Sequence, residues 1–546
     1  MRKLFLLVFF FYATTAFAQT WEDTVQRIEK LFDVYKNIPG AQLAISRNGQ
    51  VIYSKAWGMA DMEHDVSLTT ASLTEAGSVS KQFTAACILL LEQQGKLSLE
   101  DDVRKYIPEL PDYGNIIKLR HMMQHTSGLR DWGSIAAMAG WPRSSKTYDN
   151  TDALVFSTRQ KGLNNVPGAE YIYSNSNYNL FAVIIERVSG LSLADFSRKY
   201  IFDPAGMKQT QWRDDYKRIV KNRAIGYERT ATGYYTNMPN EYVYGNGGLI
   251  TTAEELLQWN NYYLNGKLGT PSLLEKQLFS NPLLNGNKHN YGAGLFIQSV
   301  NGWKDIMHDG ATAGYRAVLH HFPHLGLSIA WLSNNSMPTA VVNEVINVFV
   351  ERKPVVEQPA PAPFTVSPQT AESYAGWYRN ERNGDGLQVT AKDGNLMIQN
   401  QKLTPVSNTH FILGRNAFDF IKNGLHLVTA SNDTILFKAV SKADTSAAAL
   451  SQYTGTYFSE ETVSELNIAF KDGKLYLQTK PYFEIRLTRT YKDAFSSEAG
   501  TVYFERDKKN RLTGLRISVG RARNVLFQKT DKPVLWMPNY KFQQPW

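Results

Sequence analysis

Ser78 and Lys81 stand three residues apart in the stretch EAGSVSKQFT, where a long apolar segment begins. On a helix this spacing places both side chains on one face of the first turn. A serine hydroxyl is a poor nucleophile unless a neighbouring base takes its proton. Lysine can act as that base when burial and nearby positive charge lower its pKa. The pair therefore predicts a lysine-activated serine nucleophile, against the alternative of two surface residues at a helix start.

Two short motifs further along the chain complete a pattern with this pair. YSN stands at 173–175 and HDGA at 308–311. In this order, SVSK resembles the S-x-x-K of serine β-lactamases and penicillin-binding proteins. YSN resembles the Y-x-N of class C enzymes, and HDG resembles the H-x-G that replaces K-T-G in many of their esterase and peptidase relatives. The resemblance covers about residues 30–350.

The resemblance implies that three side chains carry the reaction. Ser78 would be the acylated nucleophile and Lys81 the proton acceptor. Tyr173 would share their proton network and activate the water that removes the acyl group. An aromatic packing role in a Tyr-rich loop is the alternative for Tyr173.

Four more residues are implied as the substrate-binding wall. Asn175 would hold the substrate amide and orient Lys81, while His308 and Gly310 would line the opposite wall on the edge strand of a sheet. The backbone N–H groups of Ser78 and Ala311 would form the oxyanion hole. The alternatives are that Asn175 caps a helix and that the histidine precedes a glycine needed only for a turn.

A histidine at 308, where β-lactamases usually carry lysine, changes the expected substrate. Histidine is largely neutral at pH 7, so the charge that meets a β-lactam carboxylate is missing. This argues against efficient β-lactam hydrolysis and favours peptidase or esterase relatives. Arg316 is a candidate replacement for that charge, with a strand-surface residue as the alternative.

The predicted function is an exported serine hydrolase that acts through an acyl-enzyme on a small peptide amide or ester. The type expected above all is a D-amino-acid peptidase, either a D-aminopeptidase or a D-Ala carboxypeptidase acting on cell-wall peptides. The alternatives are a carboxylesterase, a weak β-lactamase, or a non-enzyme such as a penicillin-recognising sensor or a ligand-binding barrel protein. No cofactor and no nucleic-acid partner are expected, and the oligomeric state stays open.

A metal site is the competing chemistry. His121 and His125 are four residues apart, and the stretch HHFPH at 320–324 is rich in histidine. However, the chain contains no H-E-x-x-H motif and no carboxylate at ligand spacing. We therefore expect structural histidines and no metal.

The elements that must position these residues indicate an α+β domain. The segment from Ser78 to about Gln94 has the length and apolar character of a buried helix. Alternating residues around Asn48-Gly49 predict a hairpin, and 314–323 and 326–334 predict adjacent strands. The family resemblance implies an antiparallel sheet with helices on both faces and a helical subdomain.

The last part of the chain repeats itself. YAGWY at 374 returns as YTGTY at 453, and LQVTAKDGNLMI at 387 returns as LNIAFKDGKLYL at 466, both with an offset of 79 residues. The pattern predicts two small antiparallel β-barrels of the lipocalin-like type. This layout resembles D-aminopeptidases, in which a barrel loop reaches the active site and helps to select a free amino group. The sequence does not identify such a loop here.

The expected domain bounds follow from composition. Residues 1–18 read as a secretory signal peptide, which leaves an exported chain without a transmembrane anchor after cleavage. A hydrolase domain at 19–352 is followed by a proline-rich linker at 353–368 and by barrels at 369–445 and 446–546. Of the net charge of +9, most lies in the C-terminal part, above all at 506–529. There the charges alternate with apolar residues, which is typical of a solvated strand face.

Overall fold

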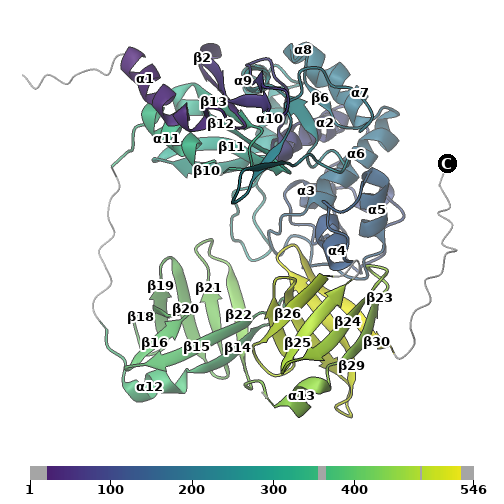
Figure 1. Cartoon of the computed structure of the whole chain (residues 1–546), viewed down its shortest axis with the longest axis vertical. Coiled ribbons are helices and arrows are strands. Elements are labelled where there is room, and N and C mark those ends of the chain that lie inside the picture. The colour runs from purple at the N-terminus through teal and green to yellow at the C-terminus, as the bar shows by residue number, and fades with distance from the viewer. Residues whose placement is uncertain (1–20, 338, 355–363, 445, 480–482, 531–546) are drawn as a thin grey trace, which may run out of the picture.

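The computed structural model describes residues 21–337, 339–354, 364–444, 446–479 and 483–530. The predicted signal peptide and residues 355–363 of the predicted linker lie outside these ranges. Figure 1 shows an N-terminal domain of sheet and helices above two separate β units. Within the described ranges, the structure contains no helix with the length and apolarity that a membrane crossing requires.

A six-stranded antiparallel sheet forms the centre of the N-terminal domain, in the order β10-β11-β12-β13-β1-β2. Strands from both ends of the domain therefore meet in one sheet, and the predicted hairpin at Asn48-Gly49 joins β1 and β2. The bounds are β1 (Ala41–Arg47), β2 (Gln50–Trp57), β10 (Phe296–Val300), β11 (Trp303–Thr312), β12 (Tyr315–Phe322) and β13 (Leu327–Ser333).

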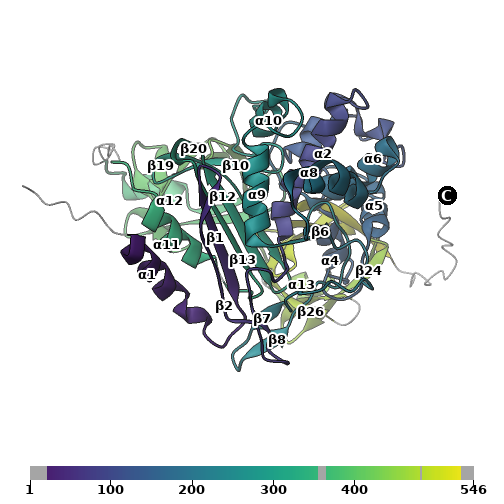
Figure 2. The same cartoon turned by 90° about the horizontal axis from the view of Figure 1, so that it is seen from above.

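Helices cover both faces of this sheet (Figure 2). On one face α1 (Trp21–Phe32) and α11 (Ala340–Phe349) pack together, and Phe32 and Ile346 join Trp331 of β13 in one apolar cluster. On the other face α9 (Ala253–Tyr263) packs on β1 and β13. The predicted buried helix is α2 (Lys81–Gln93), in which every residue from Lys81 to Leu91 is buried.

A helical subdomain packs beside the sheet and around α2. Its longest helix is α6 (Asn175–Ser189), which ends at Gly190, where a φ of 74° favours glycine. The other helices of the domain are α3 (Leu119–Met123), α4 (Trp132–Met138), α5 (Asn150–Thr158), α7 (Leu193–Ser197), α8 (Asp203–Ala205) and α10 (Pro271–Leu278). Its short strands are β3 (Met59–Asp61), β4 (Val66–Ser67), β5 (Thr74–Glu75), β6 (Gln211–Trp212), β7 (Tyr227–Arg229), β8 (Tyr234–Thr236) and β9 (Leu249–Thr251).

The first β unit is a nine-stranded antiparallel sheet that almost closes on itself. Its order is β17-β16-β15-β14-β22-β21-β20-β19-β18, and only Leu403 separates the two outer strands in sequence. Both edges of the sheet therefore come from the same stretch of chain. The bounds are β14 (Gly376–Asn380), β15 (Gly386–Lys392), β16 (Asn395–Ile398), β17 (Gln401–Lys402), β18 (Thr404–Pro405), β19 (His410–Leu413), β20 (Asn416–Ile421), β21 (Gly424–Val428) and β22 (Thr434–Val440).

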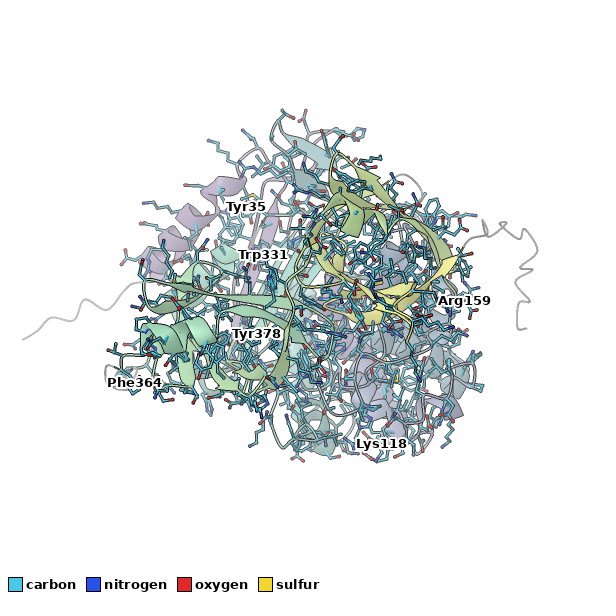
Figure 3. All side chains as sticks on the ribbon, turned by 90° about the horizontal axis from the view of Figure 1, so that it is seen from below. Tyr35, Lys118, Arg159, Trp331, Phe364 and Tyr378 are labelled. Atoms are coloured by element: carbon cyan, nitrogen blue, oxygen red, sulfur yellow. The ribbon has the colours of Figure 1, made fainter. Side chains whose placement is uncertain are left out.

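The second β unit is a closed eight-stranded barrel, in which β30 returns to pair with β23. Figure 3, seen from below, shows the two units next to each other, with Tyr378 in the first. The bounds are β23 (Gly455–Ser459), β24 (Ser464–Lys471), β25 (Lys474–Thr479), β26 (Phe483–Arg489), β27 (Ala494–Ser497), β28 (Gly500–Arg506), β29 (Leu512–Val519) and β30 (Ala522–Thr530). The predicted fold class is thus confirmed, whereas the exact domain bounds remain a prediction.

Equivalent contacts recur in the two units at the predicted offset. The Tyr378 hydroxyl donates to the Tyr374 carbonyl, and the Tyr457 hydroxyl donates to the Tyr453 carbonyl, each at 2.8 Å. The serine that caps the leading helix also recurs. Ser367 caps α12 (Pro368–Ser373), and 79 residues later Ser446 caps α13 (Ala447–Ser451). The repeat in sequence is therefore a repeat in structure.

Buried charges dock both units onto the N-terminal domain. Arg130 forms an ion pair with Glu461 of the second barrel, and the two side chains are only 4% and 6% exposed. Glu170 accepts from Arg382 of the first unit and from Arg523 of the second, each at 2.9 Å. One carboxylate of the N-terminal domain thus holds an arginine from each β unit.

Replacing Glu461 by leucine should strongly destabilise the docked barrel. Arg130 would remain buried without its counter-charge, and the Lys161 N–H would lose its acceptor. Breaking a buried pair in this way costs about 3–5 kcal/mol. Urea unfolding measures the effect, with Glu484→Leu as the control, because Glu484 pairs with Lys471 on the exposed side of the same barrel. The exposed pair should contribute less than about 1 kcal/mol, and equal losses in the two variants would contradict the prediction.

Candidate active site

Ser78 lies in a single 3-10 turn, Gly77–Ser80, that leads directly into α2. Ser78 is partly exposed, whereas Lys81, on the next turn, is fully buried. The Lys81 Nζ lies 3.2 Å from the Ser78 Oγ. The structure thus brings the predicted nucleophile and its predicted base into hydrogen-bonding contact, with the hydroxyl on the side that a substrate can reach.

The Lys81 amine has two further partners, and both are carbonyl oxygens. It donates to the Asn175 Oδ1 at 3.0 Å and to the backbone oxygen of Asn246 at 2.6 Å. A neutral amine has two N–H groups and one lone pair. Since carbonyl oxygens only accept, they can take both N–H groups and leave the lone pair directed at the Ser78 hydroxyl.

The surroundings of Lys81 favour the neutral amine. Burial lowers its pKa well below the usual value, and the nearby Arg521 guanidinium lowers it further. Asp131 acts in the opposite direction but does not outweigh burial. The pKa of His308 is also lowered, to about 4, chiefly by burial and then by Lys81, so this histidine is neutral at pH 7.

Tyr173 presents a buried phenol without a hydrogen-bond partner among the described residues. Its ring lies 4.8 Å from the Lys81 Nζ, measured to the ring centroid. Burial raises the pKa of the phenol, and the nearby Ser78 hydroxyl and Arg521 guanidinium offset part of that rise. An unpaired buried hydroxyl is costly, which is typical of a group that waits for a substrate or a water molecule.

Replacing Tyr173 by phenylalanine should lower turnover by about 10²-fold or more, the usual contribution of a proton-transfer group. Because the hydroxyl has no partner among the described residues and its burial is costly, the variant should unfold at or above the wild-type midpoint. Steady-state kinetics and thermal unfolding test both statements. Tyr457→Phe in the second barrel, which removes a paired hydroxyl far along the chain, is the matched control and should show unchanged turnover. Wild-type turnover in Tyr173→Phe would remove the phenol from the reaction.

Asn175 occupies the first turn of α6 and is held from behind by Asp131. The Asn175 N–H donates to the Asp131 Oδ2 at 2.7 Å, while the other oxygen of Asp131 caps α4 by accepting from the Ser134 N–H. Ser174, not Asn175, is the residue that precedes the helix. The Asn175 side chain is therefore available to orient Lys81, as the resemblance implied.

His308 lies behind the wall of the site. Its Nδ1–H donates to the carbonyl of Asp309 at 2.6 Å, so its Nε2 accepts from the Tyr291 hydroxyl at 3.0 Å. Both ring nitrogens have hydrogen-bond partners, and the side chain is 2% exposed. His308 therefore contributes to the site by packing and by holding Tyr291.

The strand that carries His308 is not the outermost strand of the sheet, in contrast to the expectation. β10 pairs with β11 only along Trp303–Met307, so the stretch from His308 to Thr312 has β12 on one side and no strand on the other. This half of β11 lies against the turn that carries Ser78. Residues 308–311 thus lie at an open edge of the sheet, as predicted, because the pairing of the outermost strand, β10, with β11 ends at Met307.

Gly310 and Ala311 meet the Ser78 turn closely. A Cβ on Gly310 would lie 2.1 Å from the Ala76 carbonyl and 3.0 Å from the Ser78 nitrogen, so only glycine fits there. A Cβ on Gly77, whose φ is 51°, would lie 2.7 Å from the Ala311 nitrogen. The two backbone nitrogens predicted to bind an oxyanion therefore flank the same tight contact, and Ala311 itself is exposed.

Arg316 does not take the place of the missing lysine. It is partly exposed, and its guanidinium donates to the carbonyls of Ala313 and Tyr315 in its own turn. Arg316 is therefore a residue of the strand surface, which was the alternative prediction for it.

His121 and His125 do not form a ligand pair, because α3 ends before His125. The Nδ1 of His125 accepts from the Ser174 N–H at 3.1 Å, and its ring centroid lies 4.2 Å from that of Tyr173, with the two rings tilted by 33°. This histidine supports the loop that carries Tyr173.

Three contributors at the site were not predicted from the sequence: the Asn246 carbonyl, the Asp131 carboxylate and Arg521. The Arg521 guanidinium lies 4.7 Å from the centroid of the Tyr173 ring. Arg521 stands in the turn between β29 and β30, so the second barrel reaches the site. Asn246 lies within the stretch GNGGLITTAEELLQW at 245–259. Asp131 and Arg521 carried no signal in the sequence.

Comparison with known proteins shows the family to which a chain with this site belongs. Residues 25–346 match the Beta-lactamase family. The chain belongs to the Beta-lactamase family. It is 29% identical over 403 residues to a penicillin-binding protein of Bacillus subtilis (strain 168), covering 67% of this chain and 86% of that protein. It is 25% identical over 526 residues to a D-aminopeptidase of Cereibacter sphaeroides (strain KD131), covering 91% of this chain and 98% of that protein.

A solved structure shares the fold of part of this chain. The D-amino acid amidase from Ochrobactrum anthropi SV3 matches 60% of this chain and 98% of its own, with a TM-score of 0.52 and 21% identity. The predicted resemblance of the chain to β-lactamases and penicillin-binding proteins is confirmed. The chain is a serine hydrolase of this family.

Proposed function

We propose that this chain is an exported hydrolase that forms an acyl-enzyme on Ser78 and acts on small peptide amides or esters of the D-amino-acid type. The observation that carries the proposal is the Lys81 amine. It is fully buried and next to Ser78, and its two other partners can only accept hydrogen bonds.

The first half of the reaction transfers the acyl group to the enzyme. The Ser78 Oγ attacks the carbonyl carbon while its proton passes to the Lys81 Nζ. Negative charge develops on the carbonyl oxygen, where the N–H groups of Ser78 and Ala311 would stabilise it. When the C–N or C–O bond breaks, the leaving group takes the proton through Lys81 and Tyr173.

The second half releases the acyl group as an acid. A water molecule gives its proton to the Tyr173 and Lys81 network and attacks the acyl carbon, and the Ser78 oxygen recovers its proton as the ester breaks. The unpaired hydroxyl of Tyr173 can hold that water. Asn175 would bind the substrate amide with the Nδ2 that Lys81 does not use.

The substrate type is supported by relatives, and export is supported by the sequence. The D-aminopeptidase match extends over 91% of this chain and therefore includes the β units. Neutral His308 in place of lysine favours peptides and esters over β-lactams. The signal-like residues 1–18 support export.

Covalent labelling and a substrate panel test the proposal together. A fluorophosphonate should add once per chain, on the peptide that contains Ser78, as mass spectrometry would show. D-aminoacyl amides, D-Ala-D-Ala peptides, p-nitrophenyl esters and nitrocefin are then compared at equal enzyme concentration. We expect turnover of at least one D-amino-acid substrate and only slow hydrolysis of nitrocefin. Labelling without any turnover would instead indicate a sensor.

A further inference from the structure

The second barrel places a positive charge at the mouth of the candidate active site. β29 and β30 are joined by the two-residue turn Gly520-Arg521, with Val519 paired to Ala522 at its base. The Arg521 side chain is exposed, and its guanidinium lies over the ring of Tyr173. Arg521 and Lys81 thus both lie within 5 Å of the centroid of that ring, at 4.7 and 4.8 Å.

The turn is fixed to the site by its backbone. The Arg521 carbonyl accepts from the Asp131 N–H and from the Asn164 Nδ2, each at 3.0 Å. The Asn164 Oδ1 in turn accepts from the Arg523 N–H at 2.7 Å. Asp131 also holds the Asn175 N–H, so one residue links the barrel turn to the partner of Lys81. These hydrogen bonds therefore fix the backbone of Arg521 beside the site.

Within the described part of the chain, the Arg521 guanidinium has no anionic partner. No ion pair or side-chain hydrogen bond of its guanidinium occurs there, whereas the neighbouring Arg523 pairs with Glu170 and Arg516 pairs with Glu505. A guanidinium has five N–H donors in a planar fork that matches a carboxylate. Arg521 therefore presents unused donors beside the reacting groups.

The other charged groups near the site leave this position open to an anion. Asp131 is buried and already accepts from the Asn175 and Ser134 N–H groups. Arg143 pairs with Glu241. Asp309 is exposed on β11 and does not lie within ion-pair distance of Arg521 in the described structure. An ammonium group at this position would be repelled by Arg521, while a carboxylate would gain charge-assisted hydrogen bonds.

We propose that Arg521 determines specificity by binding a carboxylate on the substrate, and that it disfavours substrates with an amine at that position. This inference rests on the proposed function and names the substrate class of the same site. It differs from the selection of a free amino group by a barrel loop, which is the role of that loop in the D-aminopeptidases that the barrel layout resembles. In this chain the barrel turn carries a cation, so the selected group should be an anion.

Matched substrates separate recognition from catalysis. Three p-nitrophenyl esters of similar length carry an anionic, a neutral or a cationic end: the glutarate half-ester, the butyrate and the 4-aminobutyrate. A second pair, N-benzoyl-D-alanyl-thioglycolate and its methyl ester, places the carboxylate on the leaving group instead. The measured quantity is the ratio of kcat/KM between charged and neutral members, which does not depend on the fraction of active enzyme.

We expect the wild-type enzyme to favour the anionic member of at least one pair by about tenfold or more. Arg521→Gln should bring this ratio close to one, and Arg521→Glu should favour the cationic ester. Lys508→Gln is the matched control, because it removes an exposed charge from the turn between β28 and β29, at the other end of β29, and it should keep the wild-type ratio.

Two outcomes are kept apart by this design. If Arg521→Gln leaves the charge ratio unchanged in both substrate sets while all substrates are hydrolysed, the role of Arg521 is overturned and the proposed function stands. If the wild-type enzyme hydrolyses none of the substrates, or Ser78→Ala hydrolyses them equally well, the proposed function itself fails.

Discussion

Ser78→Ala should abolish turnover, with a loss of about 10⁴-fold or more, while the protein remains folded. The variant removes the atom that forms the acyl bond, and the contact of that atom to Lys81 is lost with it. Lys81 keeps the Asn175 and Asn246 oxygens as acceptors, so both N–H groups of its amine stay paired. Kinetics on the best substrate and thermal unfolding measure both effects.

Ser80 provides an internal control two residues away in the same turn. Its buried hydroxyl donates to the Gly77 carbonyl at 2.6 Å and accepts from the Leu249 N–H at 3.1 Å. Ser80→Ala should therefore cost about 1–3 kcal/mol of stability and still allow acylation. A Ser78→Ala enzyme that works at the wild-type rate, or that loses activity only by unfolding, would show that Ser78 is not the nucleophile.

Lys81→Met should lower kcat by about 10³-fold, because methionine has a similar length but cannot accept a proton. The pH profile gives a second readout. In the wild-type enzyme kcat/KM should rise with pH as Lys81 loses its proton, and the midpoint of this limb should lie well below 10.5 because burial and Arg521 lower the pKa of the amine. The methionine variant should lack this limb.

Stability should depend on pH through the same group. Between the lowered pKa of folded Lys81 and the ordinary value of the unfolded chain, the unfolded state binds more protons. Wild-type stability should therefore rise with pH across this window relative to Lys81→Met. A rate limb centred near 10, together with parallel stability curves, would mean that Lys81 keeps an ordinary ammonium and is not the base.

The sequence predicted the residues that short motifs and local periodicity can identify. Ser78 and Lys81 are neighbours on a helix start, and the apolar run after them predicts burial, so their contact follows from local geometry. The hairpin at Asn48-Gly49 and the repeat with an offset of 79 residues follow equally from local patterns. Joining Tyr173 and His308 to the same site required the family resemblance, since their separation in sequence carries no distance information.

The contributors that were missed depend on tertiary docking. The Asn246 carbonyl is a backbone atom, which any residue type could supply. Arg521 stands in a basic stretch whose alternation is typical of a solvated strand face, and only the docking of the barrel on Asp131 brings it to Tyr173. The family resemblance implied that His308 lies on an edge strand. The structure adds β10 outside β11 and ends their pairing at Met307, and sequence composition does not predict where this pairing ends.

Glu170 makes the N-terminal domain an incomplete unit when it is taken alone. Its carboxylate lies three residues before Tyr173 and receives one arginine from each β unit. A recombinant fragment that stops before residue 355 would lose both cations, along with the partner of Arg130, and would place two formerly sheltered charges, Glu170 and Arg130, in solvent. The minimal catalytic fragment of this chain should therefore include both of its C-terminal units.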